Sequence, residues 1–271
     1  MIKLNEKEVI FEEFPNGETL IKVGNLQSRF WQKYDINNIT VKFEDDKDII
    51  RLIFLKKFLD EQNWDHLVLR IPYLPYSRMD RTEGMTLFTL KYLCQIINNL
   101  NFKEVVIFEP HSDVSIALLD RVRVLNTTSN ILKDLTKEGK LFLNDDTYIV
   151  FPDAGAAKRY GKQIKHNKIL IANKTRDFST GNITGLTING ELKEGSKCVI
   201  LDDLCSRGGT FIYTAQKLKE MGAGDIQLIV SHCENTIFDG DILKTDLISR
   251  VYTTDSILNR KHEKIEIIFN I

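Results

Sequence analysis

Residues 198–211 read CVILDDLCSRGGTF, and this stretch decides our interpretation of the fold. Its first four residues form a continuous apolar run, which is typical of a strand buried on both faces of a parallel sheet. An aspartate pair (Asp202 and Asp203) and a glycine pair (Gly208 and Gly209) follow, and then the helical pattern TFIYTAQKLKEMGA begins. A strand that leads through a short loop into a helix is the repeating unit of parallel α/β sheets.

The same alternation of strand and helix runs through the chain. Apolar residues that repeat at three and four positions predict a helix over 86–100. We predict a left-handed C-cap at Gly222, where the helix that follows Gly209 ends. Short apolar runs predict strands over 66–74, 104–110, 147–153, 168–174, 197–203 and 226–232. The sequence therefore predicts an α/β fold of two similar halves, each a parallel sheet flanked by helices, with domains at 1–127 and 128–271.

The composition is that of an ordinary globular protein, with 42% hydrophobic and 28% charged residues. A formal net charge of −1 argues against sequence-independent binding of nucleic acid, which needs a strongly basic surface. The four cysteines lack metal-finger spacing, and no apolar run approaches the roughly 20 residues that span a bilayer. The N-terminus does not resemble a signal peptide. We therefore expect a cytoplasmic protein with reduced thiols that binds neither nucleic acid nor membranes.

Polar side chains gather where the predicted strands end. In parallel sheets, ligands bind beyond the carboxyl ends of the strands, so residues at these ends are candidates for a site. The candidates are Arg78, Asp80, Arg81, Glu109, His111, Asp153, Lys174, Arg176, Asp202 and Asp203. Such residues stand at five separate strand ends, which is hard to ascribe to chance.

The loop that follows the aspartate pair has the residues of a phosphate site. Glycine amides at a helix N-terminus, together with the hydroxyls of Ser206 and Thr210, form an anion-binding nest. Asp202 and Asp203 can accept hydrogen bonds from vicinal ribose hydroxyls. The alternative is an ordinary strand-to-helix turn with an aspartate cap. We favour the phosphate site.

Two further strand ends suit phosphate chemistry. In FPDAGAAKRYG (151–161), Asp153 ends a strand and Gly155 opens a loop into a helix. In NKTRDFSTGNITG (173–185), Lys174 and Arg176 share one side of a strand end and precede a polar stretch with the composition of a mobile lid. Two cations that face one point suit a transition state with negative charge on a transferred phosphoryl group. The alternative for this segment is a solvated basic loop.

The motifs resemble one family in their order along the chain. DDLCSRGGT resembles the ribose-phosphate loop of the type I phosphoribosyltransferases and of the ribose-phosphate pyrophosphokinases (PRPP synthetases), except that Arg207 stands where a threonine is expected. IPYLPYSRMDR (71–81) and FPNGE (14–18) resemble the ATP-binding segments of the synthetases, and phosphoribosyltransferases generally lack this pair. The resemblance therefore favours the synthetases and implies two domains of the type I phosphoribosyltransferase kind.

The resemblance also implies roles for individual residues. Lys174 and Arg176 match the catalytic Lys-x-Arg pair of the family, and His111 and Asp153 match its magnesium-site residues, so Mg²⁺ is the expected cofactor. The implied ATP-binding residues are Phe14, Asn16, Glu18, Arg78, Asp80 and Arg81. The implied ribose-phosphate residues are Asp202, Asp203, Cys205, Ser206, Arg207, Gly208, Gly209 and Thr210, and the pyrophosphate loop holds Asp153, Ala154 and Gly155.

The implied reaction is the Mg²⁺-dependent transfer of the β,γ-diphosphate of ATP to the anomeric hydroxyl of a ribose 5-phosphate unit, with release of AMP. Arg207 leaves the acceptor open between ribose 5-phosphate, which gives PRPP, and ADP-ribose, which would connect the enzyme to NAD metabolism. A PRPP-consuming phosphoribosyltransferase and a non-catalytic regulatory subunit are the alternatives. The FPNGE segment of the synthetases reaches the adenine from a neighbouring subunit, so we expect a homodimer or higher homo-oligomer. The ATP side falls to the N-terminal domain, and the phosphate loops and lid fall to the C-terminal one.

Overall fold

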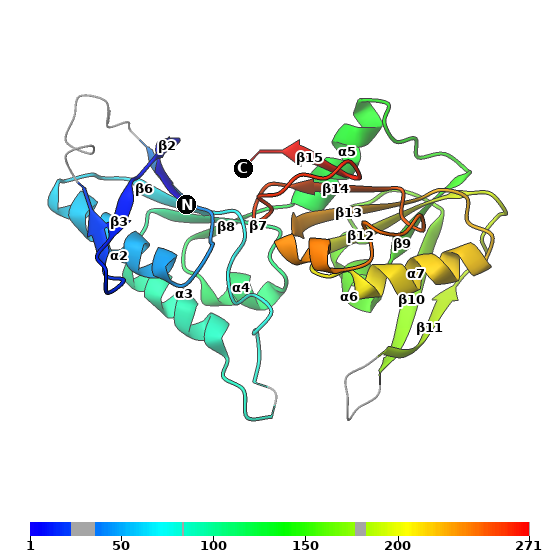
Figure 1. Cartoon of the computed structure of the whole chain (residues 1–271), viewed down its shortest axis with the longest axis horizontal. Coiled ribbons are helices and arrows are strands. Elements are labelled where there is room, and N and C mark those ends of the chain that lie inside the picture. The colour runs from blue at the N-terminus through cyan, green and yellow to red at the C-terminus, as the bar shows by residue number, and fades with distance from the viewer. Residues whose placement is uncertain (23–35, 83, 177–182, 271) are drawn as a thin grey trace. The chain divides into compact units, whose positions relative to one another are not determined.

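The computed structural model describes residues 1–22, 36–82, 84–176 and 183–270 (Figure 1). The chain divides into two compact units, Met1–Leu125 and Asn126–Ile271. Each unit is built on one large sheet, of six strands in the first unit and seven in the second. Most neighbouring strands are parallel and helices cover the sheets, which confirms the predicted α/β class.

The sheet of the Met1–Leu125 unit is parallel in one half and antiparallel at one edge. Its strand order is β2-β1-β5-β6-β7-β8. The last four strands in this order are parallel, whereas β1 runs antiparallel to both of its neighbours. The strands are β1 (Ile2–Leu4), β2 (Lys7–Glu8), β5 (Asn37–Val41), β6 (Leu67–Ile71), β7 (Glu104–Phe108) and β8 (Val122–Leu125). A separate hairpin consists of β3 (Phe11–Glu13) and β4 (Thr19–Ile21).

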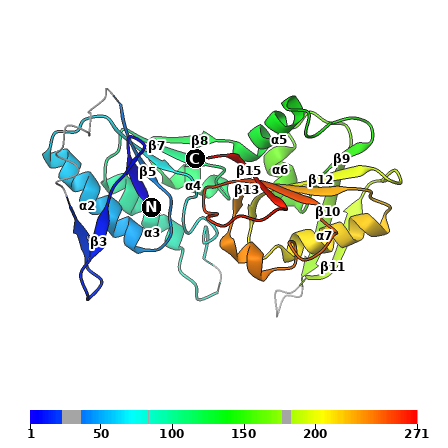
Figure 2. The same cartoon turned by 45° about the horizontal axis from the view of Figure 1, so that its top comes forward.

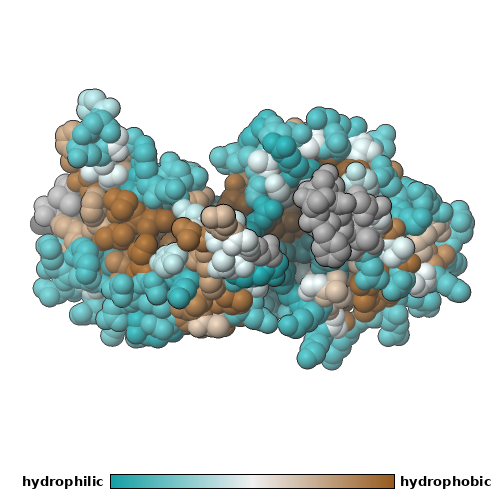
Figure 3. Space-filling view, turned by 90° about the horizontal axis from the view of Figure 1, so that it is seen from below, coloured by the Kyte–Doolittle hydropathy of each residue, from teal (hydrophilic) through white to brown (hydrophobic). Residues whose placement is uncertain are grey.

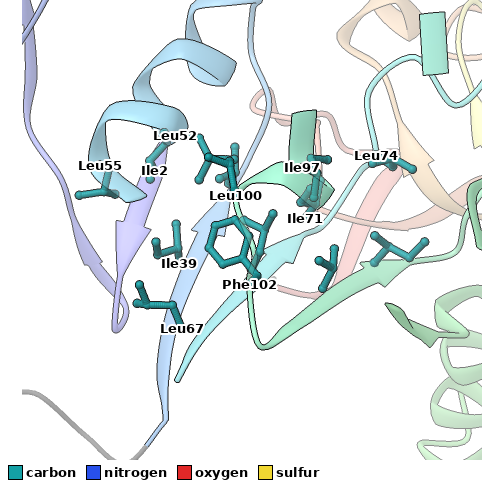
Figure 4. Packing of buried hydrophobic residues seen from close by; sticks show 14 of the residues in the cluster. Ile2, Ile39, Leu52, Leu55, Leu67, Ile71, Leu74, Ile97, Leu100 and Phe102 are labelled. Atoms are coloured by element: carbon teal, nitrogen blue, oxygen red, sulfur yellow. The ribbon is translucent and has the colours of Figure 1, made fainter. Parts of the chain in front are cut away.

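Helices α2 (Lys47–Glu61) and α3 (Thr89–Asn99) pack their apolar stripes on this sheet, and α4 (Asp113–Leu118) follows β7. Alternate residues of β6, such as Leu67 and Ile71, point into the core from the strand (Figure 4). Leu52 and Leu55 of α2 and Ile97 of α3 meet them there, because residues three and four apart share one face of a helix.

The sheet of the Asn126–Ile271 unit has the order β11-β10-β9-β12-β13-β14-β15. All neighbours are parallel except β10 and β11, which form an antiparallel pair at one edge. The strands are β9 (Thr147–Phe151), β10 (Ile169–Arg176), β11 (Ile183–Asn189), β12 (Lys197–Cys205), β13 (Ile226–Cys233), β14 (Arg250–Thr254) and β15 (Ile265–Phe269). The helices are α5 (Thr127–Lys137), α6 (Ala154–Tyr160), α7 (Gly209–Glu220) and the short 3₁₀ helix η1 (Asn235–Asp239).

Strand β12 is buried on both faces, as its continuous apolar run predicts. Val199 and Leu201 belong to a core cluster with residues of α5 and α6. Cys198 and Ile200 belong to a second cluster with residues of α7. Side chains alternate along a strand, so the two clusters fill the two faces of the sheet. Figure 2 shows α5 and α6 on one side of this sheet and α7 on the other.

The predicted end of α7 is confirmed. Gly222 has a φ of +93°, and the Ala223 amide donates a hydrogen bond of 2.9 Å to the Leu218 carbonyl, which is the bond of a Schellman cap. Helix α3 begins at Thr89 rather than at residue 86, because Phe88 takes a non-helical conformation as the N-cap. Across the described ranges, no helix is long and apolar enough to cross a bilayer.

Candidate functional site

Three aspartates meet at the carboxyl ends of two neighbouring strands in the Asn126–Ile271 unit. Strands β9 and β12 are parallel partners, with Val150 opposite Ile200, so the residues that follow them leave the same edge of the sheet. Asp153 follows β9 and caps α6, where its Oδ1 accepts a hydrogen bond of 2.9 Å from the Ala156 amide. Asp202 and Asp203 occupy the end of β12.

The aspartate pair is held by a cation that our sequence analysis did not assign. Arg159 of α6 places a guanidinium nitrogen 2.7 Å from Asp203 Oδ1 and 4.0 Å from Asp202 Oδ1. Asp203 is buried, and its amide donates a hydrogen bond of 2.9 Å to Asp202 Oδ1. The available sequence signal was the Lys-Arg pair in the helix that begins after Asp153, but a contact with the next strand end cannot be inferred from that spacing.

The charges of this cluster favour a positive ligand. Burial raises the pKa of Asp202 well above its ordinary value, and the negative charges of Asp203 and Asp153 raise it further. Burial alone would lower the pKa of Arg159, but the interactions with Asp203 and Tyr160 together outweigh it and the net shift is upward. One guanidinium thus lies near two carboxylates, and the charge of Asp153 also acts on Asp202, so a bound cation would relieve the repulsion among the three aspartates.

This donor set fits a magnesium ion that shares its coordination with a substrate. In the part of the chain that the structure describes, no three His, Cys, Asp or Glu side chains form a metal-binding cluster. Mg²⁺ usually takes one or two carboxylates, several waters and the phosphate oxygens of a substrate, so a complete protein cage is not needed. The aspartates at the ends of β9 and β12 are suitable carboxylate ligands for such an ion.

The loop between β12 and α7 has a shape that depends on glycine. Gly208 is the N-cap of α7 and has a φ of +82°. A Cβ at Gly208 would lie 2.1 Å from Ile242 Cδ1, and a Cβ at Gly240 would lie 1.9 Å from the Arg207 carbonyl oxygen. The loop therefore packs closely against residues 240–242. The first amides of a helix have no intrahelical partner, so α7 offers donors at this loop.

The side chains of this loop are not equivalent. Arg207 is exposed, whereas Cys205 is fully buried opposite Cys233 of β13. A hydrogen bond with Cys233 and burial raise the pKa of the Cys205 thiol well above its ordinary value. Cys205 can therefore reach a ligand through its backbone alone. Thr210, at the start of α7, is half-buried.

The hydroxyl of Ser206 is tied into a short relay. Thr236 donates a hydrogen bond of 2.8 Å to Glu234 Oε2, and Ser206 Oγ lies 3.0 Å from Thr236 Oγ1. A hydroxyl carries one proton, and Thr236 gives its proton to Glu234, so Ser206 donates to Thr236. Ser206 then presents lone pairs to a ligand rather than a proton. Nothing in the sequence pattern signalled this relay.

The strand that carries Lys174 and Arg176 extends beyond its neighbour. Strand β10 pairs with β9 up to Ile171, opposite Phe151, and then continues in an antiparallel hairpin with β11. In that hairpin, Lys174 lies opposite Leu186 and Arg176 opposite Ile183, with a register shift between Thr175 and Arg176. The backbone of both residues thus runs past the strand end that Asp153 follows. The central part of the predicted lid, residues 177–182, lies outside the described residues.

In the Met1–Leu125 unit, FPNGE forms the turn of the β3–β4 hairpin. The Phe14 amide donates to the Glu18 carbonyl at 2.9 Å, and the Asn16 side chain donates to Glu18 Oε2 at 2.8 Å. Glu13 anchors the hairpin to α2 through an ion pair of 2.8 Å with Arg51. The Phe14 ring is 49% exposed, so the turn presents an aromatic face to a ligand or partner.

The segments after β6 and β7 carry the other polar residues of this unit. Because β6 and β7 are parallel partners, both segments leave the same edge of the sheet. After β6, Tyr76 adopts a φ of +60° and donates a hydrogen bond to Asp46, which raises the pKa of Tyr76 to about 12. Arg78 and Arg81 are exposed, and Asp80 is half-buried. After β7, the half-buried His111 directly precedes Ser112, the N-cap of α4.

The C-terminal segments pack beneath the aspartate edge. His232 of β13 is buried, and its Nδ1 lies 2.8 Å from Ser256 Oγ. The Thr254 hydroxyl donates a hydrogen bond of 2.7 Å to the Ser231 carbonyl, and Ser231 Oγ lies 2.7 Å from Thr128 Oγ1. The Thr128 hydroxyl also lies 3.1 Å from the Asp202 carbonyl oxygen, so this buried polar network supports the end of β12.

Comparison with known proteins gives a consistent result, although no family profile matches the sequence. The ribose-phosphate pyrophosphokinase of Saccharolobus solfataricus is 24% identical over 225 residues, which cover 81% of this chain and 74% of the relative. That of Vibrio parahaemolyticus is 26% identical over 254 residues, which cover 90% and 77%. The crystal structure of phosphoribosylpyrophosphate synthetase from Mycobacterium smegmatis has the same fold, with a TM-score of 0.75 and 16% identity over 96% of this chain and 85% of that one.

The two sheets and the aspartate-bearing strand ends therefore define a protein with the fold of the PRPP synthetases. In sequence, the chain is similar to the ribose-phosphate pyrophosphokinases, which are diphosphotransferases.

Proposed function

We propose that this protein transfers the β,γ-diphosphate of ATP to the anomeric hydroxyl of a ribose 5-phosphate unit and releases AMP. The observation that carries the proposal is the meeting of Asp153, Asp202 and Asp203 at the ends of β9 and β12. Carboxylates accept hydrogen bonds from vicinal hydroxyls, and the glycine-dependent loop at the start of α7 offers amides to the sugar phosphate.

The catalytic contribution of the chain is positioning and charge. The aspartate pair would orient the ribose so that its anomeric oxygen lies in line with the β-phosphorus, and such orientation is worth on the order of 7–11 kcal/mol of the barrier. Lys174 and Arg176, at the end of β10, would stabilise the charge on the transferred group and on the departing AMP. No covalent intermediate on the enzyme is needed. Mg²⁺, when bound, would neutralise phosphate charge. Asp153 is the proposed metal residue of the Asn126–Ile271 unit, and His111 is that of the Met1–Leu125 unit.

The two units would divide the substrates. We assign ATP to the Met1–Leu125 unit through Phe14, Asn16 and Glu18 of the hairpin turn and through the basic loop after β6, which carries Arg78, Asp80 and Arg81. Ribose phosphate and pyrophosphate are assigned to the Asn126–Ile271 unit, including Ala154, Gly155 and Gly209. Two features support this assignment of the substrates. The motifs occur in the family's order along the chain, and each unit has polar residues at one edge of its sheet.

Self-association is part of the proposal. The Phe14 ring is half exposed on a turn, where it would contact the nucleotide bound by a neighbouring subunit. Large apolar side chains are exposed on α2 (Ile50 and Phe54) and on α3 (Tyr92 and Ile96), and Figure 3 shows extensive apolar surface on this unit. Exposed apolar surface of this kind marks interaction sites. A homodimer or higher homo-oligomer in the cytoplasm, where the buried cysteines stay reduced, fits these features.

The acceptor remains a choice between ribose 5-phosphate and ADP-ribose. Arg207 is exposed on the phosphate loop, and a guanidinium can hold two phosphate oxygens at once, which favours a 5′-diphosphate. Replacing Arg207 by threonine separates the two acceptors. If Arg207 binds the second phosphate, the Arg207→Thr variant loses about tenfold or more in affinity for ADP-ribose and retains ribose 5-phosphate.

The test of the function is AMP release from ATP and Mg²⁺, with ribose 5-phosphate and ADP-ribose supplied in parallel. The diphosphorylated sugar should appear in equal amount by phosphorus NMR. A phosphoribosyltransferase would instead consume PRPP with a base and release pyrophosphate without AMP, and a regulatory subunit would release no AMP at all. The proposal would be refuted if neither ribose 5-phosphate nor ADP-ribose supported AMP release.

A further inference from the structure

The aspartate pair at the end of β12 is held unequally. The Arg159 guanidinium lies 2.7 Å from Asp203 and 4.0 Å from Asp202. The Asp203 side chain is 4% exposed and the Asp202 side chain is 16% exposed. Asp203 is therefore engaged inside the unit, whereas Asp202 is the member of the pair that a ligand can reach.

The hydrogen bonds of Asp202 point to the same difference. Its Oδ1 accepts the Asp203 amide at 2.9 Å, which fixes the rotation of the carboxylate. Within the described ranges, no amide, hydroxyl or cationic group donates to its Oδ2. A carboxylate oxygen that is held in place and receives no hydrogen bond from an amide, hydroxyl or cationic group is a prepared acceptor for a ligand hydroxyl.

Arg159 is itself fixed before any ligand binds. The Gln163 side chain donates a hydrogen bond of 3.1 Å to the Arg159 carbonyl, and Ser129 of α5 donates one of 2.6 Å to Gln163 Oε1. The guanidinium also lies 5.7 Å from the centre of the Tyr160 ring, at cation–π distance. The backbone of Arg159 is thus held within the unit, and the guanidinium nitrogen that faces Asp203 is buried.

We propose that Arg159 is a positioning residue, which anchors Asp203 so that Asp202 Oδ2 faces the ribose hydroxyls of the acceptor. This inference rests on the proposed function, because it takes the acceptor to be a ribose phosphate. The alternative role for Arg159 is direct binding of the diphosphate. In that case its guanidinium would have to face the transferred group rather than Asp203.

The test compares Arg159→Met and Arg159→Lys with a matched control, Lys158→Met, which removes a neighbouring exposed cation from the same helix. Binding of ribose 5-phosphate is measured by titration calorimetry, and KM is measured for the sugar phosphate and for ATP. Arg159→Met should weaken ribose 5-phosphate binding by about 10- to 100-fold, the effect of removing the residue that orients a ligand group. Its KM for ATP should stay unchanged. Arg159→Lys should recover part of the loss, and Lys158→Met should behave as the wild type.

A second variant guards against misfolding. Arg159→Met leaves the buried Asp203 carboxylate without its partner, whereas Arg159→Met combined with Asp203→Asn removes both charges. The double variant is compared with the single variants Arg159→Met and Asp203→Asn. If Arg159 acts through Asp203, the double variant binds the sugar phosphate no more weakly than whichever single variant has the lower affinity. Additive losses, or a raised KM for ATP with unchanged sugar binding, would overturn the inference. Failure of the function itself looks different, because the wild type would then neither bind ribose 5-phosphate nor release AMP, and both proposals would fall together.

Discussion

The replacement of Gly208 by alanine tests whether the phosphate loop depends on close packing. A Cβ at this position would lie 2.1 Å from Ile242 Cδ1 and 2.6 Å from Ile242 Cγ1, and the φ of +82° is unfavourable for any residue with a Cβ. The left-handed backbone costs roughly 1–2 kcal/mol, and overpacking costs about 1–3 kcal/mol. Together these terms predict that the free energy of unfolding falls by about 2–5 kcal/mol.

Gly209→Ala is the matched control for this change. Gly209 is the next residue, its φ is not positive, and a Cβ there would meet nothing within 4 Å. Because alanine suits a helix better than glycine, this variant should be unchanged or more stable by about 0.4–1 kcal/mol. Denaturant unfolding of the full chain, followed by circular dichroism, compares both variants with the wild type.

Truncation of Ile242, the residue that a Cβ at position 208 would meet, separates the backbone cost of Gly208→Ala from its overpacking cost. Ile242→Ala alone should destabilise by about 2–5 kcal/mol, because it empties a core position. Combined with Gly208→Ala, the total should fall short of the sum by about 1–3 kcal/mol, since the overpacking disappears while the backbone cost stays. Strictly additive effects, or equal stability of the two glycine variants, would refute the reasoning from the packing of this loop.

Three further outcomes are expected. Lys174→Ala should lower the rate of AMP release by about 10²–10³-fold, as for other groups that stabilise transition-state charge. The control Lys168→Ala, at the opposite end of the strand, should leave this rate unchanged. Equal rates for Lys174→Ala and the wild type would exclude Lys174 from the mechanism. The raised pKa of Tyr76, about 12, means that its contribution to stability is present below pH 10 and disappears as pH rises from 10 to 12, so Tyr76→Phe should remove one late tyrosinate transition in ultraviolet titration. Burial raises the pKa of Cys94 to about 11 and of Cys198 to about 12, so mass spectrometry after alkylation of the native protein at mildly alkaline pH should show neither thiol modified.

The strands of both parallel sheets could be predicted because their signal is local. The run before Asp202 is apolar at every position, and the structure buries it between α7 on one face and α5 and α6 on the other. The end of α7 at Gly222 was equally readable, because a left-handed cap needs glycine within the chain segment itself. The antiparallel strands β1 and β2 and the β3–β4 hairpin were not predicted, since short strands acquire their partners from the sheet rather than from a pattern.

The candidate site could also be predicted only where the signal is local. The sequence by itself determined which residue types stand at each strand end, and therefore the acidic character of the β9 and β12 edge. Only the tertiary structure decided that Arg159 pairs with Asp203 rather than Asp202, that Cys205 faces inward, and that Ile242 closes on Gly208. The physical reason is that strand and turn signals arise between near neighbours in the chain, whereas these contacts join segments that folding alone brings within hydrogen-bond or van der Waals distance.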